Sequence, residues 1–223
     1  MYKSQTFIWA NVGSNNVVLT VNDNNGNSSN CNANVEVQDN VNPTAICQDI
    51  TIQLDAGGNA SITTSQIDNG SNDACGIASM SVSPNTFDVN NVGDNNVTLT
   101  VNDNNGNSSI CTAVVTVQDD GAPTALCQDI TVYLDGAGTV GILATDVDNG
   151  SNDPSGIDTM IVTPNTFGCV NVGGNIVTLD VTDNNGNSAQ CTATVTVFDT
   201  IPPTAFCQNI TVQLDAGGNA SIT

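Results

Sequence analysis

The sequence predicts an all-β protein made of tandem β-sandwich modules of 80 residues in an elongated array. The first observation is a repeat: PTAICQDITIQLD begins at Pro43, PTALCQDITVYLD at Pro123 and PTAFCQNITVQLD at Pro203. Self-similarity at a fixed long period is the signature of an array of like modules. The second observation is a strict alternation of apolar and polar residues, and the third is the set of turn-forming clusters between these stretches.

The repeat divides the chain into two complete modules, 43–122 and 123–202, and two partial ones. Residues 1–42 align with the C-terminal half of a repeat, and residues 203–223 align with its N-terminal part. A chain that begins and ends in mid-repeat indicates a piece of something longer. A module of this size buries a limited core, so additional covalent cross-links are expected.

Short antiparallel strands are expected throughout each module. In the first complete repeat they fall at about 45–54, 59–68, 76–83, 86–92, 96–103 and 109–118. Val97, Leu99 and Val101 alternate with polar residues, which is typical of a half-buried strand. Asn105-Gly106 supplies a hairpin turn, and no segment has a helical period. This spacing of strands and turns favours a sandwich of immunoglobulin type.

The charge is extreme and restricts the partners. Formal net charge is −21, from 22 acidic residues, all Asp except Glu36, against one basic residue, Lys3, and no His. Nucleic-acid binding is excluded because it needs Lys and Arg against phosphates. The charge also disfavours anionic membrane surfaces and favours cations. No apolar stretch reaches the length of a membrane span, and the first residues lack the pattern of a signal peptide.

Eight cysteines without a CxxC pair indicate disulfides, and therefore a location outside the cytoplasm. In the predicted topology the first and last strands of a module lie side by side in parallel and begin at the same pole. Cys47 lies near the start of the first strand and Cys111 near the start of the last. We therefore expect the disulfides Cys47–Cys111 and Cys127–Cys191.

The other four cysteines have no such partner within their own module. Cys31 and Cys207 occupy the same two positions in the incomplete repeats, so their partners are expected in another module or another chain. Cys75 and Cys169 occupy different positions of the repeat. Two interpretations remain open for this last pair: idle thiols, or cross-links between neighbouring chains.

Asp-rich loops are the candidate cation sites. Two loops of each module and the incoming linker are expected to share one pole, where gathered carboxylates repel each other unless a cation lies among them. Calcium, which takes six to eight oxygen ligands, suits such a set. The alternative is that these residues only form turns, because Asp and Asn side chains bond the local backbone. The candidate calcium ligands are Asp39, Asp68, Asp73, Asp103, Asn105, Asp119, Asp120, Asp148, Asp153 and Asp183.

The wording of the repeat resembles a known family. The PTAxC opening, the C-T-A-x-V-T-V strand that follows a D-N-N-G-N turn, and the D-x-x-x-P junction are similar to the hyalin repeat (HYR), an extracellular immunoglobulin-like module. The segments CQDITIQLDAGGNASIT and IDNGSNDACGI resemble tandem repeats of very large Bacteroidota cell-surface proteins, including adhesins of gliding bacteria. The resemblance implies a secreted, cell-surface location. It also implies O-glycosylation at Thr159 and Thr200, which lie in Asp-Thr-apolar motifs.

These observations favour a structural role: a segment of an extracellular bacterial surface stalk or filament, disulfide-linked and stiffened by calcium. Further copies of the same repeat or chain are the expected partners. Catalysis is not expected, because no His or Arg is available and aromatic residues make up only 4%. One alternative is an adhesin whose modules bind glycans or surfaces directly. A second is a subunit that polymerises head to tail by strand exchange, in which 203–223 completes 1–42; about 17 residues of a repeat would be absent from that joint, which favours a continuous chain.

Overall fold

The computed structural model describes residues 4–222, and it is an all-β protein of immunoglobulin-like sandwich modules. The chain divides into two compact units. The first runs to Thr124 and includes Asn152–Asp158 and Thr182–Ser188. The second comprises Ala125–Ser151, Thr159–Val181 and the residues from Ala189 onward. In the described part of the chain, no helix has the length and apolar character needed to cross a membrane.

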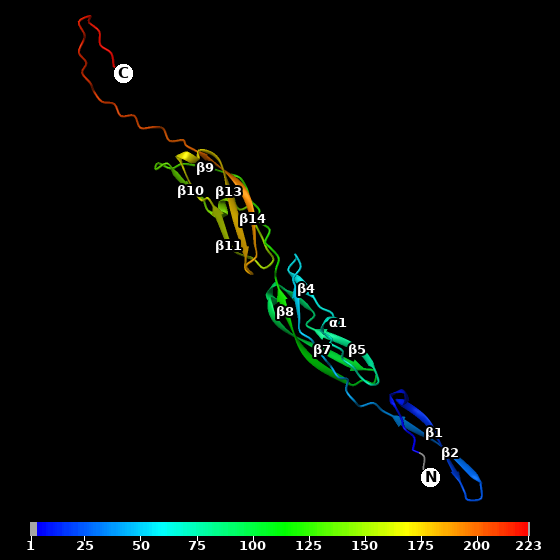
Figure 1. Cartoon of the computed structure of the whole chain (residues 1–223). Helices are drawn as coiled ribbons and strands as arrows, with labels where there is room; N and C mark the ends of the chain where they lie inside the picture. The colour runs from blue at the N-terminus through cyan, green and yellow to red at the C-terminus, as the bar shows by residue number, and fades with distance from the viewer. Residues whose placement is uncertain (1–3, 223) are drawn as a thin grey trace. The chain divides into compact units, whose positions relative to one another are not determined.

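The first complete repeat contains a four-stranded and a two-stranded sheet (Figure 1). The larger sheet has the order β3 (Ile50–Gln53), β8 (Ser108–Gln118), β7 (Gly93–Asp103) and β5 (Ile77–Ser83). Strand β3 runs parallel to β8, and the other two pairs are antiparallel. The smaller sheet pairs β4 (Asn59–Ser61) with β6 (Thr86–Asp88). First and last strands thus lie side by side, as the topology predicted from the sequence requires.

The second complete repeat has the same architecture. Its larger sheet has the order β11 (Ile157–Thr163), β13 (Gly173–Asp183), β14 (Ser188–Phe198) and β9 (Ile130–Tyr133). Its smaller sheet pairs β10 (Thr139–Gly141) with β12 (Thr166–Gly168). The parallel pair is again formed by the first and last strands, β9 and β14.

The core follows the alternation read from the sequence. Val97, Leu99 and Val101 of β7 are fully buried, as are Val115 and Val117 of β8. Their partners across the sandwich include Ile67 and Phe87. Burying one such side chain contributes about 1.5–3 kcal/mol. A period of two therefore places every second residue of the long hairpin in the core and leaves the others in contact with solvent.

The expectation that no helix is present was wrong. Short helices occur at α1 (Thr64–Ile67) and α2 (Ala144–Val147), and 3₁₀ turns occur at Trp9–Asn11, Val89–Asn91 and Cys169–Asn171. The strand expected over 59–68 therefore ends at Ser61. The reason is a local cap: the backbone N–H of Thr63 donates to the Gln66 side-chain oxygen at 2.8 Å. Ile67, at the end of the turn, is fully buried and holds it against the core.

The N-terminal part of the chain forms a separate hairpin of β1 (Gly13–Asn22) and β2 (Ser28–Val37), which pair antiparallel. In the 80-residue repeat, β1 and β2 occupy the positions of β7 and β8. Described residues after Phe198 contain no helix or strand. Within residues 4–222 no third strand joins this hairpin, and its central residues Leu19 and Val21 are each 59% exposed.

Candidate functional site

In the two complete repeats, the D-N-N-G-N loop binds the linker that enters its module. Asp103 is 3% exposed, and its Oδ1 accepts the backbone N–H groups of Asn105 and Asn107 at 2.8 Å each. Its Oδ2 accepts the Asn107 side-chain amide at 2.7 Å. The same amide donates to the backbone carbonyl of Asp39, in the linker, at 3.2 Å. The loop is therefore a hairpin turn and a clamp on the linker at the same time.

The second repeat repeats this arrangement. The Oδ1 of Asp183 accepts from the backbone of Asn185 and Asn187 at 2.8 Å, and its Oδ2 accepts the Asn187 amide at 2.9 Å. That amide also donates to the backbone carbonyl of Asp119 at 3.0 Å. We call these two arrangements the linker clamps. The role of Asn107 and Asn187 was not predicted from the sequence, although the constant spacing between each linker Asp and its D-N-N-G-N loop is a signal for it.

Hydrogen bonds keep the Asp103 carboxyl ionised although it is buried. Burial alone raises the pKa of a carboxyl group, because it disfavours the charged form. The donors from Asn107, Asn105 and Gly106 outweigh this effect and hold the pKa of Asp103 below its usual value. Asp23, in the equivalent exposed loop of the N-terminal hairpin, also has a lowered pKa, chiefly because the Asn27 side chain donates to it. The motif thus stabilises the charged carboxylate at Asp103 and at Asp23.

Two groups of acidic and thiol side chains lie beside the clamps, both within the first compact unit. The ligand atoms of Asp39, Asp73 and Cys75 all lie within 4.8 Å of one another. So do the carboxylate oxygens of Asp119, Asp153 and Asp183. We call them the first and second acidic poles. Each combines a linker residue with loop residues of the module that follows the linker.

The acidic poles fit a hard cation to different degrees. In the first pole, Asp39 Oδ2 is buried and accepts no hydrogen bond of normal geometry among the described residues, so one oxygen is free to act as a ligand. The group beside it, the Cys75 thiol, is a weak donor and a soft ligand that calcium does not favour. The second pole supplies three carboxylates, the donor type that calcium favours. The second set therefore fits calcium better than the first.

Cys75 is held as a neutral thiol. Its contact with the Asp39 carboxylate, its burial, and the charges of Asp39, Asp73 and Asp103 raise its pKa to about 11. A thiolate is the reactive form of cysteine, so this environment makes Cys75 inert at neutral pH.

The other predicted ligands lie outside the two acidic poles. Asp68 and Asp148 turn back onto their own loops, where their Oδ1 atoms accept the backbone N–H groups of Ser71 at 2.9 Å and Ser151 at 3.0 Å. These bonds, together with the serine side chains, hold the pKa of both carboxyls down, against the opposing effect of burial. Asp120 and Asn105 are exposed and belong to neither group.

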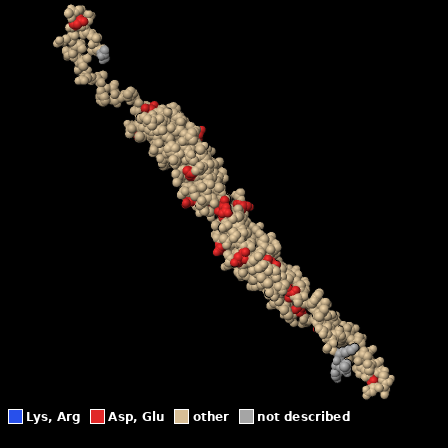
Figure 2. Space-filling view, in the orientation of Figure 1, with Lys and Arg blue, Asp and Glu red and all other residues tan. Residues whose placement is uncertain are grey.

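The described surface carries negative charge without positive charge. Figure 2 shows Asp and Glu distributed over it, and residues 4–222 contain no Lys, Arg or His. The carboxylates of this part of the chain therefore have no ionic partner of their own. Their charge is balanced by cations from the solvent, which is the condition under which a gathered set of carboxylates recruits an ion.

Two disulfides close the complete repeats. Cys47 is bonded to Cys111 and Cys127 to Cys191, each across a sequence separation of 64 residues. Each disulfide joins the segment before the first strand to the beginning of the last, at the edge where those strands pair in parallel.

The remaining candidate residues are solvent-accessible. Cys31, Cys169 and Cys207 are exposed free thiols. The two predicted glycosylation sites, Thr159 in β11 and Thr200 after β14, are also exposed.

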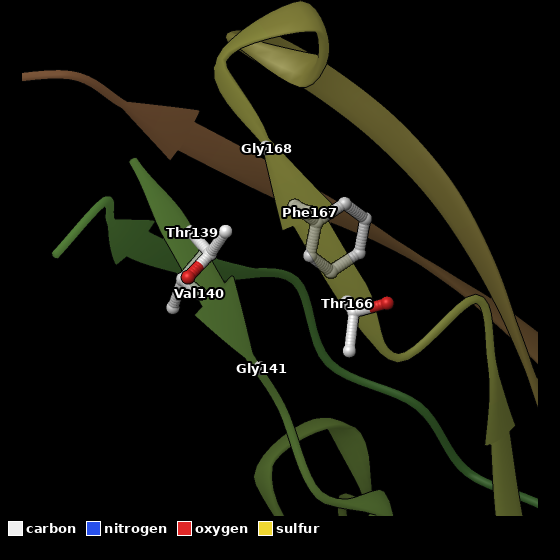
Figure 3. Close-up of a pocket in the computed structure, with 6 residues that line it drawn as sticks. All are labelled: Thr139, Val140, Gly141, Thr166, Phe167 and Gly168. Carbon is white, nitrogen blue, oxygen red and sulfur yellow. The ribbon is translucent and has the colours of Figure 1, made fainter. Parts of the chain in front are cut away.

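A shallow depression lies over the β10–β12 ladder, lined by Thr139, Val140, Gly141, Thr166, Phe167 and Gly168 (Figure 3). The Phe167 ring is 3% exposed and belongs to the core. The two threonine hydroxyls are the only side-chain polar groups in this lining, and no titratable group accompanies them. The depression therefore has no acid, base or activated nucleophile with which to perform chemistry.

The fold resembles those of solved extracellular repeat proteins. Protocadherin gamma B7 extracellular cadherin domains 1–4 match at 14% identity and a TM-score of 0.37, over 86% of this chain and 59% of that chain. Protocadherin gamma C5 EC1–3 matches at 14% and 0.38, over 82% and 77%. Human mucin-like protocadherin EC1–2 matches at 14% and 0.36, over 69% and 97%. The chain spans about three fifths of the first of these structures.

No protein-family model matches the chain, and a search of curated proteins finds no match.

Proposed function

We propose that this chain is a load-bearing segment of an extracellular bacterial surface stalk or filament. The observation that carries the proposal is the position of the disulfides relative to the path of the chain. The linker enters each repeat just before the first cysteine, and the chain leaves soon after the second. Tension applied to the two ends of a repeat therefore passes through the disulfide and along the rest of β8, and it bypasses the chain between the two cysteines.

This arrangement limits how far a repeat extends. Of the 80 residues in the first complete repeat, the 64 that separate Cys47 from Cys111 are shielded by the covalent bond. Extended chain spans at most about 3.6 Å per residue, so the 64 shielded residues represent about 230 Å of chain that a repeat releases on unfolding only after its disulfide is reduced. A protein built to transmit force benefits from this difference, because its length changes little even when a module opens.

The linker clamps support the same role. A short linker with a proline and with a backbone carbonyl held by Asn107 or Asn187 has little freedom to hinge at the point where it enters the module. Disulfides are typical of oxidising compartments, which supports the extracellular location. The bacterial surface origin rests on the resemblance to HYR tandem repeats of Bacteroidota.

Force spectroscopy of the chain, tethered at its ends, tests the proposal. We expect the length increment on unfolding a repeat to be about 230 Å longer after reduction than in the oxidised protein, and to be lengthened by the same amount in the first repeat alone in the Cys47→Ala/Cys111→Ala variant. The second repeat of the same variant is the matched control, since its disulfide remains. Long increments in the oxidised wild-type protein would refute the load-bearing role.

We further propose that calcium binds at the acidic poles and fixes the linker there. The second acidic pole, with three carboxylates, is the stronger candidate. Calorimetric titration with calcium, and melting with calcium against chelator, test this. Asp153→Asn should weaken binding at least tenfold, whereas Asp158→Asn, an exposed neighbour outside the pole, should not. Identical melting with calcium and with chelator would leave these residues as turn formers only.

A further inference from the structure

The outer face of the larger sheet differs between the two complete repeats at one place. Near the point where β9 and β14 end, the second repeat exposes four large apolar side chains: Tyr133 (58% exposed), Val172 (53%), Ile176 (66%) and Phe198 (47%). Gly174 lies between Val172 and Ile176 in the chain. We call these five residues the outer patch.

Strand alternation places these residues on one face. Val177 and Leu179 of β13 are buried, as is Val197 of β14, so the even-numbered residues of both strands point away from the core. Tyr133 is the partner of Phe198 in the parallel β9–β14 ladder, and their rings stack with centroids 5.9 Å apart. Strands β13 and β14 are neighbours in the sheet. The outer patch therefore extends over three adjacent strands.

The first complete repeat is more polar at the same positions. Four of the five positions lose a polar side chain in the second repeat, and the equivalent pairs are Gln53 and Tyr133, Asp94 and Gly174, Asn96 and Ile176, and Gln118 and Phe198. The two larger sheets nevertheless have the same strand order. The fold therefore does not require the apolar residues, and their grouping on one surface indicates a local role of that surface.

The chain that follows a repeat does not cover this face. Gln53 and Gln118 are both exposed, although a complete repeat follows them in the sequence. The rings of Tyr133 and Phe198 alone leave about 200 Å² accessible to solvent. A contiguous exposed apolar patch on a soluble protein marks a site of interaction, whereas scattered apolar residues do not.

Charge restricts the partner that fits the outer patch. Residues 4–222 are acidic and contain no Lys, Arg or His, so a cationic partner is attracted by carboxylates, which this patch lacks (Figure 2). The carboxylate of Asp94 is absent at the equivalent residue, Gly174. Loss of a carboxylate favours contact with another acidic surface, because like charges brought together across an interface repel. In the proposed filament, the neighbouring acidic surface is a second copy of this chain.

The shape of the outer patch is self-complementary. Val172 and Ile176 flank Gly174, which leaves a hollow because it has no side chain. The methyl group of Thr194 borders this hollow, since a Cβ on Gly174 would lie 3.5 Å from it. Residues two apart on one face of a strand are separated by about 6.8 Å. A two-fold axis midway between Gly174 and Ile176 therefore places Ile176 of each copy over Gly174 of the other.

We propose that the outer patch is a lateral contact between two copies of this chain, packed face to face with opposite strand directions. The proposal rests on the proposed function, which it deepens by naming the surface through which stalks or filaments associate side by side. A standard interface buries about 800 Å² on each partner, several times the area of the two aromatic rings. A single contact is therefore weak and reversible, and arrays with several contacts gain strength from multivalency.

Sedimentation equilibrium of the full chain, from micromolar to millimolar concentration, tests the proposal. A Cys31→Ser/Cys169→Ser/Cys207→Ser background removes the exposed thiols and so prevents unrelated disulfides. We expect a reversible monomer–dimer equilibrium that tightens as salt rises, because salt screens the repulsion between two acidic copies. A monomer at all concentrations, or association that weakens as salt rises, would overturn the proposal.

Variants that restore the residues of the first repeat test the outer patch without disturbing the fold. Ile176→Asn and Gly174→Asp should each raise the dimer dissociation constant at least tenfold and leave the melting temperature unchanged. Leu143→Thr is the matched control, because it also replaces an exposed apolar side chain with the residue of the first repeat, but lies before α2 and outside the larger sheet. An equal effect of all three variants, or no effect of the two patch variants, would contradict the proposed contact.

Other occupants of the outer patch give different results. Glycan-array binding that Ile176→Asn abolishes, by a chain that stays monomeric, would assign the patch to a sugar and overturn the lateral contact. A monomer whose force increments still depend on the disulfides would overturn the contact and leave the proposed function standing. A dimer whose increments do not depend on the disulfides would support the contact and refute the load-bearing role.

Discussion

Removal of one disulfide is expected to destabilise one repeat selectively. The Cys47→Ala/Cys111→Ala variant opens a loop closed across 64 residues. In the chain-entropy model, a disulfide that closes a loop of this length reduces the entropy of the unfolded chain. It thereby stabilises the folded state by about 4 kcal/mol. A module of 80 residues has little stability in excess of this value, because small domains bury a limited core. The variant repeat should therefore be close to its folding limit.

Hydrogen exchange read by mass spectrometry provides the assay, because it resolves the two repeats in one molecule. Core amides of β7 and β8 should exchange about 1000-fold faster, since each 1.4 kcal/mol corresponds to a factor of ten. Amides of β13 and β14, in the repeat that retains Cys127–Cys191, serve as the internal control. An acceleration of less than tenfold in β7 and β8, or an equal one in both repeats, would refute the reasoning.

Four further outcomes are expected. Asn187→Ala removes the amide that holds the linker carbonyl, which costs about 1–2 kcal/mol of hydrogen bonding. Limited proteolysis of the linker at 119–123 should therefore become several-fold faster. Alkylation of Cys75 should be slow at pH 7 and rise about tenfold per pH unit until pH nears its pKa of about 11. A double-mutant cycle on Tyr133 and Phe198, read by urea unfolding, should yield a coupling of about 0.5–1.5 kcal/mol. Because the pKa of Asp103 is lowered, its stabilisation is complete above about pH 4 and is lost as pH falls through that pKa, so the hydrogen-exchange protection of its loop should fall only under strong acid.

Much of the fold is predictable because it depends on a local pattern. Alternation across Val97, Leu99 and Val101 specifies which face of the strand is buried, whatever the rest of the chain does. The parallel placement of first and last strands is a property of the sandwich topology, and it brings Cys47 and Cys111 together at a Cα separation of 5.9 Å.

What escaped prediction depends on single hydrogen bonds. The turn at α1 exists because Gln66 caps Thr63, and this competes with strand formation over the same residues. The linker clamp depends on a backbone carbonyl, and the sequence marks it only through the constant spacing between the linker Asp and its D-N-N-G-N loop. Asp68 and Asp73 lie five residues apart in one loop, yet only Asp73 joins the acidic pole because Asp68 bonds its own turn.

The two acidic poles differ through one substitution, and the difference has a chemical consequence. Position 75 is Cys, and the equivalent position 155 is Ser. The Ser155 hydroxyl donates to Asp153 Oδ1 at 2.6 Å, so it bonds a carboxylate of its own loop. Cys75 instead lies among the carboxylates of the first pole and is held there as a thiol by their charge. Repulsion is thus relieved in the first pole by a neutral sulfur, and in the second it remains among three carboxylates. Of the two acidic poles, the second is therefore the one at which the proposed calcium ion should bind more tightly.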